Sequence, residues 1–281
     1  MTSRNCRFCN ANLVSFCDLG NSPLANSFLK KDQLQTKEIF YPLHAYICEF
    51  CLLVQLDEFE SPQNIFSDYA YFSSYSKTWL KHCQDYTNQI TSRFKFDNNK
   101  KVIEIASNDG YLLKYFKDKN IPVLGIEPAE NIANVAESSG VRTIKSFFNS
   151  KLAHKLAGDG EQADLMICNN VLAHVPNLND FIAGLKILLK PDGILTLEFP
   201  SLMKLIEQNQ FDTIYHEHFS YFSLLTVEKI FLYHGLILFD VDELNTHGGS
   251  LRIYVKHQEN TKNTISKNLS RVKLTEKNKG L

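Results

Sequence analysis

A strand followed by a tight turn and a helix, at residues 101–119, is the feature that most constrains the fold of this chain. Val102–Ile105 is rich in β-branched residues, small and polar residues follow it, and residues 111–119 have helical periodicity. A second strand-like run, residues 123–128, places Glu127 17 positions after Gly110. In a doubly wound α/β sheet, the first turn lets backbone N–H groups approach a ligand, and an acid ending the second strand accepts both ribose hydroxyls. The stretch therefore predicts a nucleoside-binding unit.

The turn lacks the glycine triplet of dinucleotide-binding proteins. Ala106, Asn108 and Gly110 stand where the three glycines of G-x-G-x-G would be. S-adenosylmethionine has no pyrophosphate for the turn to enclose, so a turn with one glycine suits this cofactor better than a dinucleotide. An ordinary βα unit with a glycine turn remains the alternative for these residues alone.

Strand-like and helical segments alternate through residues 99–200. Further strands are expected at residues 142–144, 163–168 and 193–199, and helices at residues 131–138, 150–157 and 179–189. We expect the last helix to stop at Pro191 and a turn to follow at Asp192-Gly193. Five strands separated by helices predict a parallel sheet with right-handed crossovers.

Two strands at residues 237–244 and 250–257 follow an amphipathic helix at residues 223–235. The five-residue connection of residues 245–249 is short enough only for an antiparallel hairpin. A five-stranded parallel sheet closed by such a hairpin is similar to the arrangement of class I methyltransferases, an α/β Rossmann-like fold, and classical dinucleotide folds lack it. Residues 99–257 are accordingly predicted to form an S-adenosylmethionine-binding domain.

The N-terminal region, residues 1–60, contains two pairs of cysteines at knuckle spacing: Cys6 with Cys9, and Cys48 with Cys51. Two such pairs can form a closed tetrahedral zinc site with no open position for catalysis. The 38 residues between the pairs exceed the usual spacing, so a loop or extra strands must lie there. A redox pair or a chance spacing is the alternative.

The bulk composition excludes several classes. With 281 residues, 44% hydrophobic and 22% charged, the chain resembles soluble globular proteins. The net charge of −1 gives no global basic surface for nucleic acid. No apolar run approaches the ~20 residues of a membrane span, and the polar N-terminus has no signal-peptide core. A cytoplasmic location is the expectation.

Residues 61–98 join the two regions. An aromatic and hydroxyl cluster containing Tyr69, Tyr71 and Tyr75 precedes a helical pattern that begins at about Ser76. These tyrosines either pack the join between the domains or line a polar substrate pocket as part of a helical lid.

Polar residues gather at two places where a ligand is expected. Asn169 and Asn170 end the fourth predicted strand, at the edge where open α/β sheets bind ligands, and His174 follows them as a candidate base or packing residue. Residues 214–222 crowd histidine, carboxylate and phenol groups together. General acid–base catalysis is the role that fits this segment, with His218 removing a proton and Glu217 orienting the His218 ring. A metal site on an H-x-H strand and a bland polar loop are the alternatives.

Several motifs together resemble one family, the S-adenosylmethionine-dependent sugar C-methyltransferases that act on nucleotide-linked keto-deoxysugars. The motifs, in family order, are CRFC with CEFC, YFSSYS, VIEIASNDGYLL, GIEPAENIA, NNVLAHVPNLNDF, YHEHFSYFS and THGGSLRIY. The resemblance covers nearly the whole chain. Family members usually continue into a further C-terminal domain, so residues 258–281, with a solvated helix at about residues 265–274, are expected to begin a domain that is missing here.

The resemblance implies a role for each matched residue. The cofactor would contact Glu104, Ala106, Ser107, Asn108, Gly110, Glu127, Pro128 and Asn170. The nucleotide-sugar would lie near Tyr71, Tyr75 and the segment from Tyr215 to His218. Cys6, Cys9, Cys48 and Cys51 would bind structural zinc, and no nucleic-acid or membrane partner is implied.

The implied chemistry is methyl transfer to carbon. A 4-keto sugar offers a carbon nucleophile once a proton next to its carbonyl is removed. His218 is the expected base, Glu217 tunes it, and Tyr215 is the alternative acid or base. Tyr71 and Tyr75 are expected to donate to the enolate oxygen. An O- or N-methyltransferase of the same fold, or a cofactor-binding remnant without activity, is the alternative function.

Overall fold

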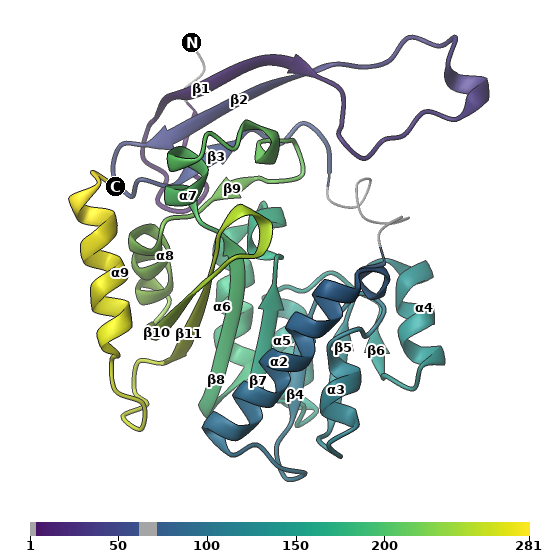
Figure 1. The fold of residues 1–281 in the computed structure, drawn as a ribbon, viewed down its shortest axis with the longest axis vertical. Coiled ribbons are helices and arrows are strands. Elements are labelled where there is room, and N and C mark those ends of the chain that lie inside the picture. The colour runs from purple at the N-terminus through teal and green to yellow at the C-terminus, as the bar shows by residue number, and fades with distance from the viewer. Residues whose placement is uncertain (1–3, 62–71) are drawn as a thin grey trace.

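The computed structural model describes residues 4–61 and 72–281, and within them two sheets form the framework (Figure 1). The larger sheet has seven strands. In spatial order these are β10 (Leu236–Leu244), β11 (Ser250–His257), β8 (Leu189–Pro200), β7 (Ala163–Asn169), β4 (Val102–Ile105), β5 (Val123–Ile126) and β6 (Thr143–Ile144). The strands from β8 to β6 are parallel, whereas β11 runs antiparallel to both β8 and β10. This topology confirms the predicted parallel sheet with a terminal hairpin.

Helices cover both faces of this sheet. One face carries α2 (Lys77–Phe94), α3 (Leu113–Lys117) and α4 (Glu130–Ser138), and the other carries α5 (Ser150–Gly158), α6 (Leu178–Leu188), α8 (Leu224–Tyr233) and α9 (Lys267–Asn278). In Figure 1, α2 lies in front of the sheet and α6 behind it. Most buried strand residues are apolar on both faces, as a sheet sandwiched between helix layers requires, and the charged exceptions include Glu104, Glu198 and Arg252.

The structure corrects the expected helix–turn–strand boundary at Pro191. Helix α6 ends at Leu188, and β8 already begins at Leu189 and continues through Pro191. The register with β7 shifts from Ala163 opposite Leu189 to Leu165 opposite Ile194, so the proline lies in a bulge. A bulged residue needs no ladder hydrogen bond, and this is why a strand can contain proline there.

The smaller sheet lies across the carboxyl ends of the parallel strands (Figure 1). It is antiparallel, in the order β1 (Leu13–Ser22), β2 (Tyr41–Cys48), β3 (Val54–Leu56) and β9 (Ser220–Tyr221). Strands β1 and β2 lie between the two cysteine pairs, as the long spacing predicted. Strand β9 comes from residues 220–221, far along the chain, so residues 1–60 do not complete their own sheet.

The C-terminal helix is packed rather than solvated, which corrects our expectation. Leu269 and Val272 of α9 belong to the core formed with α8 and β10. Glu276 is fully buried, and its two carboxylate oxygens accept the backbone N–H groups of Leu224 and Leu225 at 2.8 and 2.9 Å. A carboxylate at these orphan donors stabilises the start of α8, so the last helix is an integral part of this fold.

Across residues 4–61 and 72–281, the structure contains no helix with the length and apolar character needed to cross a membrane.

Candidate active site

The turn after β4 has the backbone shape of a glycine-rich loop, although only one of its three left-handed residues is a glycine. Ala106, Asn108 and Gly110 adopt φ angles of 53°, 48° and 76°, all in the left-handed region. This region costs an alanine roughly 1–2 kcal/mol and asparagine less. A Cβ on Gly110 would in addition lie 3.1 Å from Val141 Cγ2. Three left-handed residues in five form the type of concave backbone turn that glycines usually provide.

A group of buried oxygens without hydrogen-bond partners surrounds this turn. The six atoms are both carboxylate oxygens of Glu104, the Ser107 hydroxyl, Asp109 Oδ1, and the amide oxygens of Asn169 and Asn170. They come from the ends of the adjacent strands β4 and β7 and from the residues that directly follow them, at the carboxyl edge of the sheet. Burial, with the neighbouring carboxylates of Glu127 and Asp109, raises the pKa of Glu104 well above its usual range, while Tyr111 opposes the rise. Such orphaned oxygens are suited to a bound ligand or ordered water that donates hydrogen bonds.

Glu127 is placed as the predicted ribose acceptor. It directly follows β5, is 5% exposed, and accepts the N–H groups of Asn108 at 3.0 Å and Ala129 at 2.9 Å. Burial raises the pKa of this carboxyl, and the two N–H groups oppose the rise. Each oxygen retains a lone pair for a sugar hydroxyl. Pro128 lies beside it, half-buried.

These residues fit S-adenosylmethionine. The nucleoside of this cofactor brings ribose hydroxyls and an adenine amino group, and its methionine part brings an ammonium group. All of these are donors that match the orphaned oxygens. A pyrophosphate, by contrast, would need donors from the protein. Glu104, Asp109, Glu127 and the two asparagines would therefore hold the cofactor. Asp109 and Asn169 were not among the predicted contacts, although both sit beside residues that were.

A 3-10 turn, Ser73–Tyr75, is hydrogen-bonded directly to the turn after β4. The Ser73 and Ser74 N–H groups donate to Asn108 Oδ1 at 3.0 Å and Asp109 Oδ2 at 3.3 Å. Tyr75 is 80% exposed and stacks on Phe72, with ring centroids 5.4 Å apart, so its side chain lies at the surface here. Tyr71, the other predicted tyrosine, and Tyr69 lie outside the described residues.

The four predicted cysteines meet in one cluster. Their sulfurs all lie within 4.8 Å of one another, with Cys6 3.5 Å from Cys51 and Cys9 3.4 Å from Cys48. Zn–S bonds of about 2.3 Å imply S···S separations of roughly 3.8 Å, so these sulfurs fit a four-thiolate zinc site. Backbone N–H groups of Phe50 and Cys51 point at Cys48 Sγ, as in a knuckle. Among the residues that the structure describes, no other such cluster occurs, which disfavours a metal on His216 and His218.

A turn brings Tyr215 and His218 together. The His218 N–H donates to the Tyr215 carbonyl at 2.9 Å, which makes them the first and last residues of a four-residue turn. The His218 ring donates from Nδ1 to the Thr213 carbonyl at 3.0 Å, because a carbonyl can only accept. Its Nε2 therefore accepts from the Tyr215 hydroxyl at 2.9 Å. The ring is a neutral imidazole whose basic nitrogen faces a phenol.

A second imidazole lies against the first. The His174 and His218 ring centroids are 4.8 Å apart, and His174 Nδ1 donates to the Glu217 carbonyl at 2.8 Å. Burial lowers the pKa of His174 to about 4, and burial together with His174 lowers the pKa of His218 to about 3. Both rings are thus neutral at pH 7. Sequence analysis identified both histidines but gave no sign that they touch.

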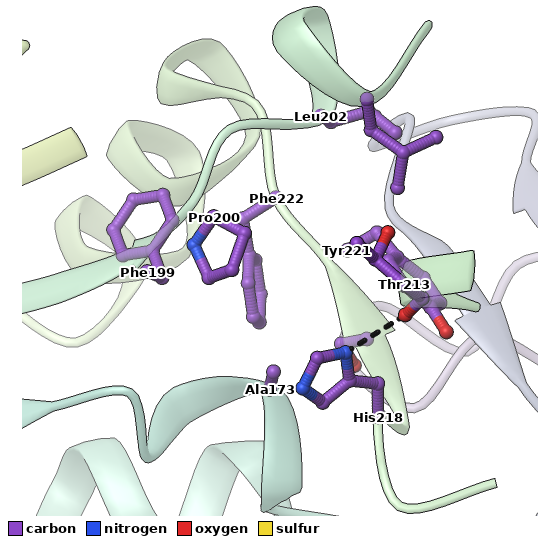
Figure 2. Close-up of a pocket in the computed structure, with 10 residues that line it drawn as sticks. Ala173, Phe199, Pro200, Leu202, Thr213, His218, Tyr221 and Phe222 are labelled. Carbon is purple, nitrogen blue, oxygen red and sulfur yellow. Dashed lines mark hydrogen bonds between the residues drawn. The ribbon is translucent and has the colours of Figure 1, made fainter. Parts of the chain in front are cut away.

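A small apolar pocket accounts for the desolvation of His218. Figure 2 shows the ring at its wall, with the dashed hydrogen bond to Thr213. The lining is mainly apolar and consists of Ala173, Phe199, Pro200, Leu202, Leu205, Thr213, His218, Ser220, Tyr221 and Phe222. Apolar walls exclude water from one side of the imidazole, and this disfavours its protonated form.

Glu217 does not orient His218, which corrects the sequence-based assignment. Its carboxylate accepts from Asn26 Nδ2 at 2.7 Å, a residue from the loop after β1, and its other oxygen is buried without a partner. The Thr213 carbonyl orients His218 instead. His216 also faces the smaller sheet, donating to the Pro42 carbonyl at 3.1 Å. Burial raises the pKa of Glu217, and Asn26 opposes this.

Comparison with known proteins agrees with this geometry. A family model described as "Methyltransferase domain" matches residues 79–239, more than half of the chain. The chain belongs to this methyltransferase family. A second model, described as "Putative zinc binding domain", matches residues 6–66 and so includes all four cysteines. The class I methyltransferase fold, the cofactor S-adenosylmethionine and an N-terminal zinc-binding region are therefore shown for this chain.

Individual relatives refine the comparison. C-methyltransferase NovU of Streptomyces niveus is 34% identical over 253 residues, covering 89% of this chain and 60% of NovU. The chain thus spans about three-fifths of that relative. A ubiquinone biosynthesis O-methyltransferase of Bartonella tribocorum is 26% identical over 141 residues, covering 49% of this chain and 57% of that enzyme.

Two solved structures share the fold. The magnesium protoporphyrin IX methyltransferase ChlM of Synechocystis, solved with bound SAH, superposes with a TM-score of 0.51 at 15% identity, covering 63% of this chain and 82% of ChlM. The PH0226 protein of Pyrococcus horikoshii gives 0.54 at 16% identity, covering 71% of this chain and 99% of PH0226. At this identity the likeness concerns the fold alone.

Proposed function

We propose that this methyltransferase moves the methyl group of S-adenosylmethionine to a carbon next to the carbonyl of a nucleotide-linked 4-keto-deoxyhexose. The contact between the neutral rings of His174 and His218, beside the cofactor edge of the sheet, is the observation that carries the proposal. The match to a relative called a C-methyltransferase, which aligns with 89% of the chain, supports it.

The reaction removes one proton from carbon and replaces the C–S bond of the cofactor with a new C–C bond. A base takes the proton from the carbon next to the carbonyl, which leaves an enolate. The enolate carbon then attacks the methyl group, the C–C bond forms as the C–S bond breaks, and the sulfur leaves as a neutral thioether. The proton is finally released to solvent. Holding carbon and methyl about 3–3.5 Å apart in line is the proximity contribution of the protein.

Nε2 of His218 is the proposed proton acceptor, reached directly or through the Tyr215 hydroxyl that donates to it. A pKa of about 3 keeps the ring unprotonated and ready, but makes it a weak base alone. Donors to the enolate oxygen are therefore needed to lower the cost of the carbanion. Tyr71 and Tyr75 remain the proposed donors, and Tyr75 would have to turn inward from its exposed position. Glu217 and Asn26 would bind sugar hydroxyls.

O-methylation of a small molecule is the second candidate, favoured by the match to ubiquinone biosynthesis O-methyltransferases. That reaction removes a hydroxyl proton, which is far more acidic than a C–H proton, and needs no enolate donors.

Labelled methyl transfer separates the two functions. The zinc-loaded chain is incubated with ¹³C-methyl S-adenosylmethionine and a dTDP-4-keto-deoxyhexose, and the product is examined by NMR. A label bonded to ring carbon is expected, and a label on oxygen or no product would contradict the proposal. We expect His218→Asn to lower turnover by about 10²- to 10⁴-fold. An equal loss in Tyr215→Phe indicates proton transfer through the phenol, and a small loss indicates direct transfer to the imidazole.

A further inference from the structure

Arg7, between the two cysteines of the first knuckle, contacts both segments that carry the imidazoles. Its Nη1 donates to the Pro176 carbonyl at 3.5 Å, two residues after His174. Its guanidinium carbon lies 5.6 Å from the centre of the Phe219 ring, the residue after His218. A single side chain of the zinc-binding region therefore spans the two parts of the candidate site.

The other contacts of Arg7 fix it to β3. Its Nε and its backbone N–H donate to Gln55 Oε1 at 3.3 and 3.0 Å, and its Nη2 donates to the Leu56 carbonyl. The Leu56 N–H in turn donates to the Phe219 carbonyl at 3.1 Å, which continues the pairing of β3 with β9. Arg7 is thus held by the same strand that pairs with the His218 segment.

The geometry of the two rings depends on these segments staying in register. His174 Nδ1 bonds the Glu217 carbonyl, so a shift of either segment would break that bond and separate the rings. Misplacing a reacting group by 1 Å costs about 10²-fold in rate. A planar guanidinium donates in several fixed directions at once, which a lysine ammonium on a flexible stem cannot reproduce.

We propose that Arg7 is a positioning residue that holds His174 and His218 in contact, and that its role is separate from zinc binding. The inference rests on the proposed function for its effect on rate, but not for its effect on the rings. Arg7 touches neither the cofactor residues nor the reacting atoms; it acts through Pro176 and Phe219.

The test compares Arg7→Lys and Arg7→Gln with Arg4→Lys. Arg4 is a matched control because it lies in the same region, pairs with Asp57 at 2.8 Å and is exposed. Zinc content, affinity for S-adenosylmethionine, methyl transfer and the ¹⁵N NMR shifts of the histidine rings are measured for each variant. We expect both Arg7 variants to keep zinc and cofactor affinity, to lose about 10²-fold in kcat, and to shift the His174 and His218 resonances. Arg4→Lys should change none of these.

Two results would overturn the proposal. Unchanged ring resonances in both Arg7 variants would show that the imidazoles are positioned without Arg7. Loss of zinc in both variants would show that Arg7 acts through the metal site. The ring resonances are read without substrate, so a wild-type chain that methylates no sugar would refute the proposed function and leave this measurement decisive for Arg7.

Discussion

The cofactor end and the substrate end of the candidate site are built in opposite ways. The cofactor end consists of short stretches at the carboxyl ends of β4, β5 and β7, residues 104–110, 127–129 and 169–170, each placed by the strand that it ends or follows. The substrate end combines a loop after β1, the first cysteine knuckle, a loop after β7 and the turn before β9. Cofactor binding should therefore survive damage to the zinc-binding region, whereas the substrate end should lose its structure.

Removal of zinc should separate the two ends most strongly. In Cys48→Ser the four-thiolate site is broken, and structural zinc contributes about 10 kcal/mol or more to the folding of such regions. From the sequence we expect the N-terminal region to unfold, and the pairing of β3 with β9 extends that loss to the His218 segment. Methyl transfer should disappear. Because the seven-stranded sheet and its helices should stay folded without the smaller sheet, titration calorimetry should find an S-adenosylmethionine affinity within about tenfold of wild type.

The matched control is Cys17→Ser, a cysteine outside the cluster, which should keep its metal and activity. A Cys48→Ser chain that stays folded and metal-loaded, or one that loses cofactor binding entirely, would contradict this division of the molecule.

The pH dependence of stability should also differ between the two ends. Burial lowers the pKa values of His174 and His218 to about 4 and 3, so the unfolded chain binds more protons than the folded chain between about pH 6.5 and pH 4. Stability from these rings is present above pH 6.5 and is lost as pH falls, by at most roughly 3 kcal/mol for His174 and roughly 5 kcal/mol for His218. In denaturant titrations, the free energy of unfolding of His218→Asn should fall less steeply than that of wild type as pH is lowered. An unchanged pH dependence would show that the His218 ring is not desolvated.

Glu104 should act in the opposite direction at the cofactor end. Its raised pKa means that the folded chain holds a proton that the unfolded chain has released, so its contribution is present below about pH 4.5 and is lost as pH rises. In Glu104→Gln this loss should be absent, and the affinity for S-adenosylmethionine should fall. A variant with the wild-type pH profile of melting temperature would show that Glu104 is not the group responsible.

The smallest expected effect concerns the strained turn. Ala106→Gly should relieve a left-handed alanine and raise the free energy of unfolding by about 0.5–1 kcal/mol, part of the gain being offset by the greater chain entropy of glycine. Cofactor affinity should stay the same, because the backbone shape is unchanged. Thermal melts of this variant beside Ala133→Gly, a buried helical position where glycine should destabilise, provide the comparison.

Sequence reasoning predicted the strand–turn–helix unit of the cofactor end because its determinants are local. The turn after β4 and the position of Glu127 follow from a pattern within about 30 residues. The substrate end depends on contacts that no local pattern encodes. The two-residue strand β9 pairs with β3, which lies some 165 positions earlier in the chain. The hydrogen bond from Asn26 to Glu217 joins residues 191 positions apart. Glu217 was misassigned because neighbours in a turn point in different directions: Tyr215 and His218 meet at its ends, while Glu217 points to the smaller sheet.

Solvent-deuterium exchange tests the central claim most directly. The zinc-loaded chain is given S-adenosylhomocysteine, which has no methyl group to transfer, and a dTDP-4-keto-deoxyhexose in D₂O. The account predicts that wild type exchanges the proton next to the carbonyl, and that His218→Asn binds the cofactor product equally well but exchanges at least about 10²-fold more slowly. Exchange at the wild-type rate in His218→Asn, or none in wild type, would contradict a substrate end built around that imidazole.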